Sequence, residues 1–272
     1  MSRYKLRANY DIENIDSQKM DGTVIVDVPM LSNGELNYGL SHIKKKLYEE
    51  NVYPSEIGFD IMSLATMVYM ADTRIERVVH GQDSWTREIE LEIPVSNVEI
   101  WDSQIRTVER MLKFLTGDLW KITLSSRAWQ FNNLEEVREK SNKYDEVSLF
   151  SGGMDSLIST INLMENKKNT LLISHAGEGL TKNAQKNIVN KFDLLYPDVL
   201  HTWLDLWMVF PRDYIPAGGN DNNTRSRSFL FIGYALFAMT GMDNINELLV
   251  PENGLIALNV PLDETRVGSF ST

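Results

Sequence analysis

The hexapeptide Ser151-Gly152-Gly153-Met154-Asp155-Ser156 constrains the fold of this chain more than any other stretch. An apolar run at 147–150 precedes it, and a helix-compatible segment at 157–164 follows it. A tight glycine turn between a strand and a helix leaves backbone N–H groups free to bind an anion. The two adjacent glycines would let a phosphate approach the backbone closely, because no Cβ atom stands in the way.

Three side chains of this turn add to the expected anion site. The hydroxyls of Ser151 and Ser156 are hydrogen-bond donors, and Asp155 near the helix start can cap N–H groups or help to hold a metal ion. Glycine-rich turns are common, so the hexapeptide is equally compatible with a simple strand-to-helix turn that carries a good N-cap. The local sequence alone leaves both interpretations open.

Composition excludes several classes of protein. The chain has 272 residues, of which 43% are hydrophobic, and this is enough for a substantial core in one or two domains. The net charge of −11 argues against general nucleic-acid binding, which needs a basic surface, and leaves open only a local basic groove. Because cysteine is absent, disulfides and cysteine-ligated zinc are excluded within these residues, and the four scattered histidines form no HExxH motif.

Membrane and export signals are absent from the sequence. No apolar run of about 18 residues occurs, so we expect no transmembrane helix. The N-terminal segment lacks the apolar stretch of a signal peptide. The expected location is therefore the cytoplasm.

The first half of the chain predicts an α+β domain over residues 1–143. Apolar spacing predicts helices at 40–50 and 55–77 after an initial group of strands. Apolar and polar residues alternate in 86–95, which is typical of a half-exposed antiparallel strand. The remaining patterns predict, in order, a helix that begins after Asn97 and ends at Gly117, a strand at 119–131 and a polar linker at 132–143.

Three groups of residues in this half could contact a ligand but are more typical of ordinary structure. The methionines at 62, 67 and 70 would line a groove or fill the core. The lysines at 44–46 would meet a phosphate or form a solvated helix face. The tryptophans at 85, 101, 120 and 129 would stack on a ligand or pack in the core and at a domain interface. In each case we expect the structural role, and we expect the domain as a whole to contact a partner protein.

From Tyr144 onward, short apolar segments alternate with helical patterns. The predicted strands are 147–150, 170–174, 199–206 and 248–250, and the predicted helices are 155–166, 181–196 and 224–239. This alternation predicts an α/β fold with a parallel sheet and helices on both faces. Ligands of such sheets bind at the carboxyl ends of the strands, where the hexapeptide lies and where polar residues follow the other strands.

The hexapeptide resembles the SGGxDS loop of the N-type ATP pyrophosphatases, or PP-loop enzymes. In that family the loop binds the pyrophosphate part of ATP, the enzyme adenylates a carbonyl or carboxylate oxygen, and a nucleophile then displaces AMP. The resemblance implies that residues 144–272 form a PP-loop domain (adenine nucleotide alpha hydrolase-like, or HUP), preceded by a smaller α+β domain. It also implies ATP and Mg²⁺ as ligands, with Gly152 and Gly153 on the phosphates and Asp155 as the carboxylate nearest to the metal.

Within that superfamily the chain is similar to the 7-cyano-7-deazaguanine synthase (QueC-like) branch. The segment Arg227-Ser228-Phe229-Leu230-Phe231 resembles the RNxLF segment of that branch, with Ser228 in place of the usual Asn. The segments 85–91 and 114–118 are similar to QueC-like proteins of bacterial antiphage systems, namely the Qat system and type IV CBASS. The branch's four-cysteine zinc cluster is missing, so we expect no Zn²⁺ within this chain, and we expect the domain to continue beyond Thr272.

The resemblance, together with the strand ends, gives further candidate residues. Asp155, Arg227 and Glu252 are the catalytic candidates. Arg225 and Arg227 would stabilise the leaving pyrophosphate or form surface ion pairs. Adenine and ribose are expected near Ser174, His175 and Gly177, although His175 is also compatible with a packed loop histidine. Glu252 and Asn253 would position the nucleophile or form a plain turn, and Trp203, Asp205 and Trp207 would bind a purine-like acceptor or belong to the strand core.

The function implied is adenylation of a deazaguanine-type carboxylate. In the family the acceptor is 7-carboxy-7-deazaguanine and the nucleophile is ammonia. In a defence operon the nucleophile could instead be an amine of a partner protein. The alternative is a non-catalytic, nucleotide-binding scaffold of a defence complex, which the serine at 228 and the missing cysteines favour. A tRNA-modifying enzyme is disfavoured because the chain is acidic.

Overall fold

The structure is a computed structural model, and it describes residues 3–131, 139–221, 223, 225–243 and 245–252. Within these residues the chain is an α/β protein whose two main sheets are mostly parallel. The first half of the chain provides the sheet with strand order β2-β3-β1-β6-β7, and the second half provides the sheet with order β10-β9-β8-β11. In the first sheet β2 runs antiparallel to β3.

The elements of the first half begin with three strands and a small hairpin. They are β1 (Arg3–Asn9), β2 (Asp16–Met20), β3 (Thr23–Pro29), β4 (Leu31–Ser32) and β5 (Glu35–Leu36). Helices then connect the strands that complete the sheet. These elements are α1 (Leu40–Glu49), α2 (Glu56–Arg74), α3 (Arg77–His80), β6 (Glu88–Val95), α4 (Val98–Asp102), α5 (Ile105–Thr116) and β7 (Leu119–Ser126).

The second half alternates strand and helix, as the sequence predicts. Its elements are β8 (Glu146–Leu149), α6 (Met154–Glu165), β9 (Thr170–Ala176), α7 (Gly179–Leu195), β10 (His201–Trp207), α8 (Arg227–Met239) and β11 (Leu248–Leu249). The strands β9, β8 and β11 pair in parallel, and β10 extends the sheet beside β9. The predicted parallel sheet is therefore confirmed for this part of the chain.

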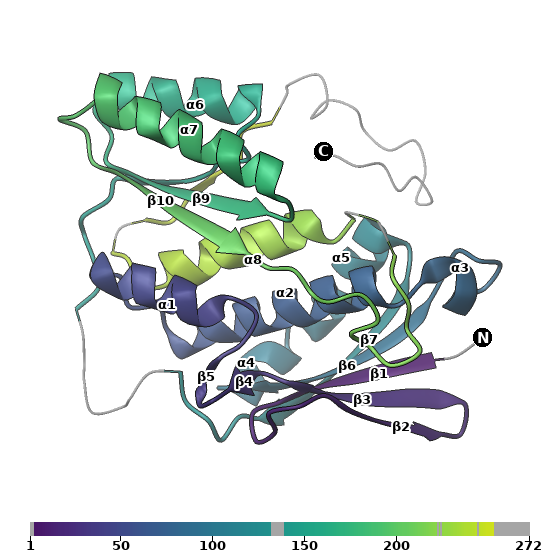
Figure 1. The fold of residues 1–272 in the computed structure, drawn as a ribbon. Helices are drawn as coiled ribbons and strands as arrows, with labels where there is room; N and C mark the ends of the chain where they lie inside the picture. The colour runs from purple at the N-terminus through teal and green to yellow at the C-terminus, as the bar shows by residue number, and fades with distance from the viewer. Residues whose placement is uncertain (1–2, 132–138, 222, 224, 244, 253–272) are drawn as a thin grey trace.

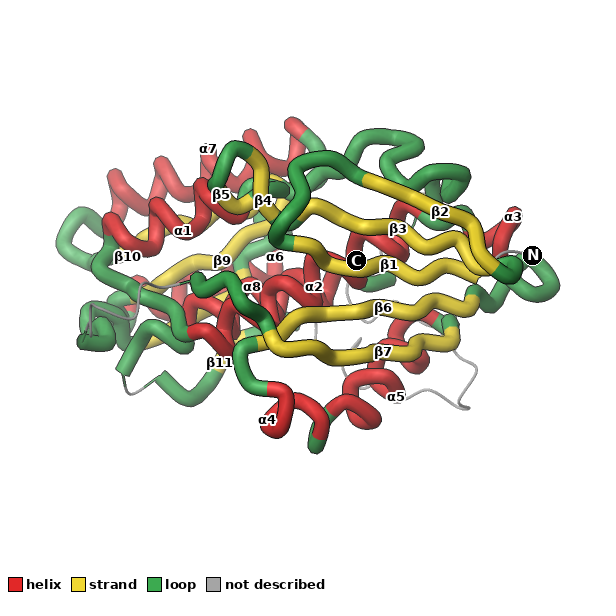
Figure 2. Tube along the Cα trace, turned by 90° about the horizontal axis from the view of Figure 1, so that it is seen from below, coloured by secondary structure: helices red, strands yellow, loops and turns green. Residues whose placement is uncertain are grey.

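Helices α2 and α8 lie side by side between the two sheets (Figure 1). Helices α6 and α7 cover the opposite face of the second sheet, and α2 packs on one face of the first sheet. Within the part of the chain that the structure describes, no helix covers the other face of the first sheet (Figure 2). A buried helical layer therefore joins the two halves of the molecule.

The contact between α2 and α8 is close because it places small residues opposite each other. A Cβ atom added to Gly233 of α8 would lie 2.8 Å from the Cβ of Ala65 on α2. Around this point one apolar cluster runs from Val26 and Met67 in the first half to Leu230 and Tyr234 in the second. Burial of this shared apolar surface stabilises the pairing of the two halves.

The expectation of an antiparallel strand at 86–95 is wrong. The strand β6 pairs in parallel with both β1 and β7. Its alternating pattern arises because one face of this parallel sheet is open to solvent, where Lys5 of β1 forms ion pairs with Glu90 and Glu92 of β6 at 3.2 and 2.9 Å. Alternation reports exposure of one face, and it does not report strand direction.

Other local expectations differ in their bounds. The helix expected after Asn97 is divided into α4 and α5, and Gly117 ends α5 with the positive φ of 78° that a helix C-terminus favours. The strand expected at 119–131 ends at Ser126.

Met62, Met67 and Met70 are fully buried, which confirms their role in the core. Residues 132–138 of the predicted linker lie outside the described residues.

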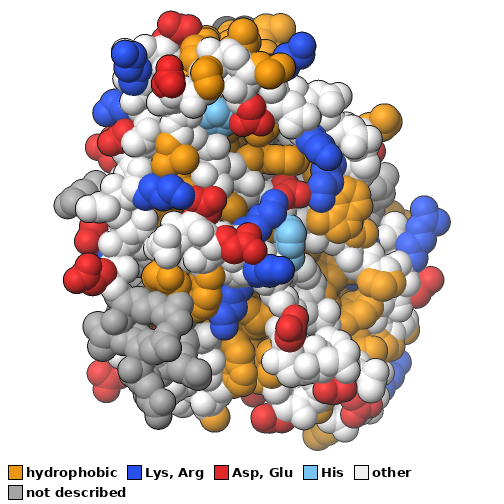
Figure 3. All heavy atoms as spheres, turned by 60° about the vertical axis from the view of Figure 1, so that its left-hand side comes forward, with side chains coloured by type: hydrophobic (Ala, Val, Ile, Leu, Met, Phe, Trp, Pro, Cys, Tyr) orange, Lys and Arg blue, Asp and Glu red, His pale blue; other side chains and the backbone are white. Residues whose placement is uncertain are grey.

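The surface carries both signs of charge. On the face shown in Figure 3, basic side chains lie next to acidic ones. Among the described residues, no helix is both long enough and apolar enough to cross a membrane.

Candidate functional site

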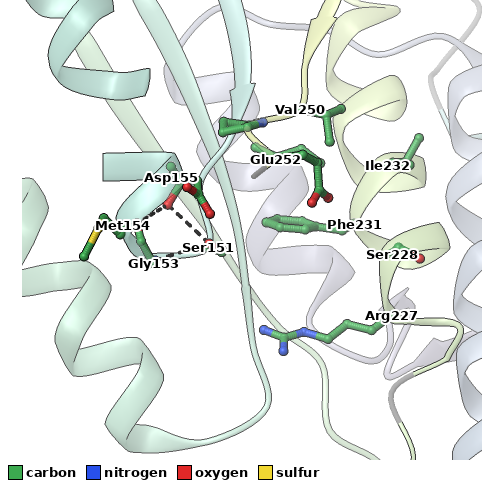
Figure 4. A pocket seen from close by; sticks show the side chains of 13 residues that line it. Ser151, Gly153, Met154, Asp155, Arg227, Ser228, Phe231, Ile232, Val250 and Glu252 are labelled. Atoms are coloured by element: carbon green, nitrogen blue, oxygen red, sulfur yellow. Dashed lines mark hydrogen bonds between the residues drawn. The ribbon is translucent and has the colours of Figure 1, made fainter. Parts of the chain in front are cut away.

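The order of strands in the second sheet reverses beside β8. From β8 the chain moves outward through β9 and β10, and it then returns to place β11 on the opposite side of β8. Ligands of open parallel sheets bind beyond the carboxyl ends of the strands at such a reversal. A pocket of about 350 Å³ lies there, which we call the loop pocket (Figure 4). The end of β8, the glycine loop (residues 151–156), α8 and residues 250–252 form its walls.

Six of the predicted site residues meet in the loop pocket. They are Ser151, Gly153, Asp155, Ser156, Arg227 and Glu252. Three separate segments of the chain contribute them, and Figure 4 shows the loop on one side of the pocket and the α8 residues on the other. The sequence predicts these residues as site residues from separate segments, and the fold brings them together in one pocket.

The glycine loop has a backbone conformation that requires glycine at position 152. Gly152 has a φ of 82°, which side chains rarely adopt. A Cβ atom there would also lie 2.9 Å from Cγ of Gln185, a fully buried residue of α7. The amide of Gln185 donates to the carbonyl of Ser151 at 3.0 Å. Gln185 therefore fixes the position of the glycine loop through this hydrogen bond.

The serine hydroxyls organise the loop internally. Ser156, which is buried, accepts from the N–H of Gly152 at 3.1 Å and donates to the carbonyl of Gly153 at 2.9 Å. The hydroxyl of Ser151 accepts from the N–H of Gly153 at 3.2 Å. These N–H groups are the ones expected to bind phosphate, so an arriving anion would take the place of the serine oxygens, which can rotate to donate instead.

Two carboxylates belong to the loop pocket. Partial burial raises the pKa of Glu252, and the negative charge of Asp155 raises it further. Among the described residues, no group of three or more His, Asp or Glu side chains is placed to hold a metal ion. Mg²⁺ commonly binds through one or two carboxylates and completes its shell with phosphate oxygens and water. Asp155 and Glu252 fit that chemistry, since their mutual repulsion would be relieved by a divalent cation.

Arg227 supplies positive charge opposite the loop. It is the first residue of α8, and its side chain extends from the helix toward the loop side of the pocket (Figure 4). One Nη2–H donates to the carbonyl of His175 at 3.3 Å, so the guanidinium lies near the end of β9 as well. Next to it, Phe231, Ile232 and Val250 form an apolar wall of the pocket. The loop pocket thus combines an anion-binding end with an apolar end.

Comparison with protein-family models, curated proteins and solved structures found no match to this chain.

The residues expected around adenine and ribose divide between two environments. His175 and Gly177 line a second cavity of about 460 Å³ on the other side of Arg227, which also lines it. Ser174 is fully buried, and its hydroxyl donates to the carbonyl of Phe150 and accepts from the indole of Trp203. Ser174 therefore connects strands, and it lines neither of the two cavities.

Arg225 lies away from both cavities. Its guanidinium donates to the carbonyl of Thr116 at 2.9 Å and lies over the ring of Trp85, 4.6 Å from the centroid. It thus contacts the first half of the chain. Asp205 forms ion pairs with Lys46 and Lys182, so one lysine of the run at 44–46 contacts β10. Asn253 lies outside the described residues.

Two buried polar residues that support the loop pocket belong to none of the predicted motifs. Gln185 lies on the buried stripe of α7 with Val189 and Phe192, and a polar side chain in such a stripe is a signal that could have been noticed. Asp72 of α2 is fully buried and accepts from the backbone N–H of Ser226 at 3.0 Å, just before Arg227. No local motif indicates that contact, because 154 positions separate the two residues.

Proposed function

We propose that this chain is an ATP-dependent enzyme of the N-type ATP pyrophosphatase class. The observation that carries the proposal is the loop pocket. A glycine loop of the SGGxDS type, an arginine at a helix start and two carboxylates converge there, at the reversal of strand order in a parallel sheet. The strand order β10-β9-β8-β11 supports an adenine nucleotide alpha hydrolase-like (HUP) fold for this half.

Each part of the loop pocket has a role in binding ATP. The N–H groups of Gly152 and Gly153 and the hydroxyls of Ser151 and Ser156 would bind the β- and γ-phosphates, close to the positive end of α6. Asp155 and Glu252 would hold Mg²⁺, which supplies positive charge to the phosphates. The apolar wall at Phe231 and Val250 suits a flat base.

The proposed reaction is adenylation of a carboxylate followed by displacement. A carboxylate oxygen of the acceptor attacks the α-phosphorus of ATP, and the bond from that phosphorus to the bridging oxygen breaks. Pyrophosphate leaves with the electron pair of that bond, and Arg227 stabilises its negative charge. An amine then attacks the acyl adenylate, AMP leaves, and the amine nitrogen loses a proton to give the amide.

The QueC-like sequence features narrow the reactants. The acceptor is a 7-deazaguanine carboxylate. The nucleophile is ammonia, or an amine of a partner protein encoded in the same antiphage-defence operon, as in the Qat or type IV CBASS systems. We place this activity in the cytoplasm. These assignments follow from the segment at 227–231 and from the similarity of segments in the first half of the chain.

A nucleotide-binding scaffold is the second candidate. Ser228 lines the loop pocket at the position where the family has Asn, so one expected polar contact differs. A scaffold would retain ATP binding and partner binding without turnover.

The test is release of pyrophosphate. Purified chain with ATP, Mg²⁺ and 7-carboxy-7-deazaguanine is assayed with and without its operon partner, and the partner is examined by mass spectrometry for an added deazaguanine. Asp155→Asn, which keeps the size of the side chain, should reduce pyrophosphate release by about a hundredfold or more. If wild type and Asp155→Asn protect bacteria from phage equally and neither releases pyrophosphate, the chain is a scaffold and the proposed enzyme activity is wrong.

A further inference from the structure

The second cavity includes His175 and Gly177, near which the sequence predicts adenine and ribose, but the proposed function puts the base of ATP against Phe231 and Val250 and leaves this cavity without a ligand. Both halves of the chain form it: Tyr69 and Thr73 come from α2, His175 from the end of β9, and residues 208–212 from the segment after β10. It is at least as large as the loop pocket, at about 460 Å³. A reaction between ATP and an acceptor needs two adjoining sites, and Arg227 lines both cavities.

Aromatic rings form one wall of the second cavity. The ring of Tyr69 meets the imidazole of His175 edge to face at 5.5 Å between centroids, and it lies 6.0 Å from the ring of Phe210. Such walls present flat apolar surface with fixed edges, which favours a planar ligand over a flexible chain.

His175 is a buried residue of this wall. Its side chain is 1% exposed, and its Nδ1 has no hydrogen-bond partner among the described residues. Its Nε2 lies 3.5 Å from the carbonyl of Met208, so Nε2–H is the donor and Nδ1 carries the lone pair. Burial lowers the pKa of His175 to about 4, and the charge of Arg227 acts in the same direction. The imidazole is therefore neutral near neutral pH and adds no charge to this wall of the cavity.

The charges at the second cavity favour an anion. Three arginines line it, but all the hydrogen bonds that Arg74 makes go to the carbonyls of Thr73, Phe210 and Pro211. Arg212 is exposed and forms no ion pair with a described residue, which leaves it and Arg227 for a ligand. On the acidic side, Asp221 lies within reach of Arg77 and Arg87, at 3.7 and 3.5 Å, and Glu178 forms no ion pair with a residue that the structure describes.

We propose that the second cavity binds the acceptor as a planar anion, with its ring against Tyr69 and Phe210 and its carboxylate between Arg212 and Arg227. The proposal rests on the proposed function for the need of a second substrate, and the cavity itself supplies the shape and the charge. Because α2 forms one wall of the second cavity, the first half of the chain determines which acceptor molecules can bind there. Arg212 and Tyr69 are then specificity-determining residues that no motif of the second half contains.

The test measures binding of three ligands separately by calorimetry on the full chain. The probes are 7-carboxy-7-deazaguanine, its neutral 7-amide as a matched ligand, and a non-hydrolysable ATP analogue. Arg212→Gln removes the exposed charge, and Thr181→Trp places a bulky side chain at the cavity, which Thr181 also lines. Arg110→Gln, at an exposed arginine of α5 away from both cavities, is the control.

We expect Arg212→Gln to weaken binding of the acid about tenfold, as removal of a charge-assisted hydrogen bond does, with little effect on the amide or the ATP analogue. Thr181→Trp should weaken the acid at least as much. Loss of ATP-analogue binding with the acid unaffected would make the cavity a nucleoside site and overturn the proposal. No change in any ligand, or no binding of the acid by wild type, would also overturn it. If the acid binds as expected but wild type releases no pyrophosphate, the proposed reaction fails and the binding site stands.

Discussion

Replacing Asp72 by Asn should lower both the unfolding free energy of this protein and its affinity for ATP. The Asp72 carboxylate is fully buried and lies between two donors. Nη2 of Arg87 donates to Oδ1 at 2.5 Å, and the backbone N–H of Ser226 donates to Oδ2 at 3.0 Å. An amide offers only one acceptor atom, so in the variant its NH₂ group must face one of these donors. The charged Arg87 binds the carbonyl oxygen more strongly than a neutral N–H does, so we expect the N–H of Ser226 at the start of α8 to lose its acceptor.

The expected loss of stability is about 3 kcal/mol, the lower end for breaking a buried ion pair. The lower end applies because Asp118 still accepts from Nε and Nη2 of Arg87 at 3.2 and 2.6 Å. Domains commonly have ~5–15 kcal/mol of unfolding free energy, so the variant should remain folded. Displacement of the α8 start should also weaken ATP binding about tenfold, since the N–H of Ser226 immediately precedes Arg227.

Asp60→Asn provides a matched control on the same helix. Asp60 is also fully buried and pairs with Arg127 at 2.8 Å, but its other partners are Ser96 and Trp101, none of which belongs to α8. Denaturant unfolding gives the stability of each variant, and calorimetry gives its affinity for ATP. Both variants should lose stability, and only Asp72→Asn should lose affinity. Equal losses of affinity, or a stability change below about 1 kcal/mol in Asp72→Asn, would refute the reasoning.

Two further predictions concern the loop and the second cavity. Gly152→Ala should destabilise the protein by about 1–2 kcal/mol and weaken ATP binding, because alanine disfavours a positive φ and its Cβ would meet Gln185. Gly153→Ala is the control: its φ is −82° and its Cβ would lie 3.4 Å from the Ser151 hydroxyl, so thermal and denaturant unfolding should change little. His175 should contribute a pH dependence, since its folded pKa of about 4 lies below the ordinary 6.5. The unfolded chain then binds the proton more readily, so this stability is present above about pH 6.5 and is lost as the pH falls toward 4. Between about pH 7 and about pH 5, wild type should lose about 2 kcal/mol more unfolding free energy than His175→Asn, and parallel pH profiles would contradict the buried, neutral ring.

The sequence predicted the local part of the site and the parallel sheet of the second half. The glycine loop could be recognised because strand, turn and helix start are encoded within about ten consecutive residues. The direction of β6 could not, because alternation in 86–95 reports only that one face is exposed. Arg225 and Arg227 looked equivalent, yet side chains two residues apart at a helix start project to different sides. One contacts Trp85 and the other lines the loop pocket.

Residues on both sides of the boundary predicted near residue 143 line the second cavity. Tyr69, Asp72 and Thr73 lie within about one turn of α2. Tyr69 and Thr73 line the second cavity, and Asp72 binds the backbone N–H that precedes Arg227. The buried charges around them are balanced, with Arg77 and Arg87 facing Asp72 and Asp118. A network of this kind is costly to break and adds little net stability, so its value lies in fixing one arrangement of α2, the first sheet and α8. Asp72 thereby ties the first half of the chain to the backbone that precedes Arg227, a residue of the loop pocket.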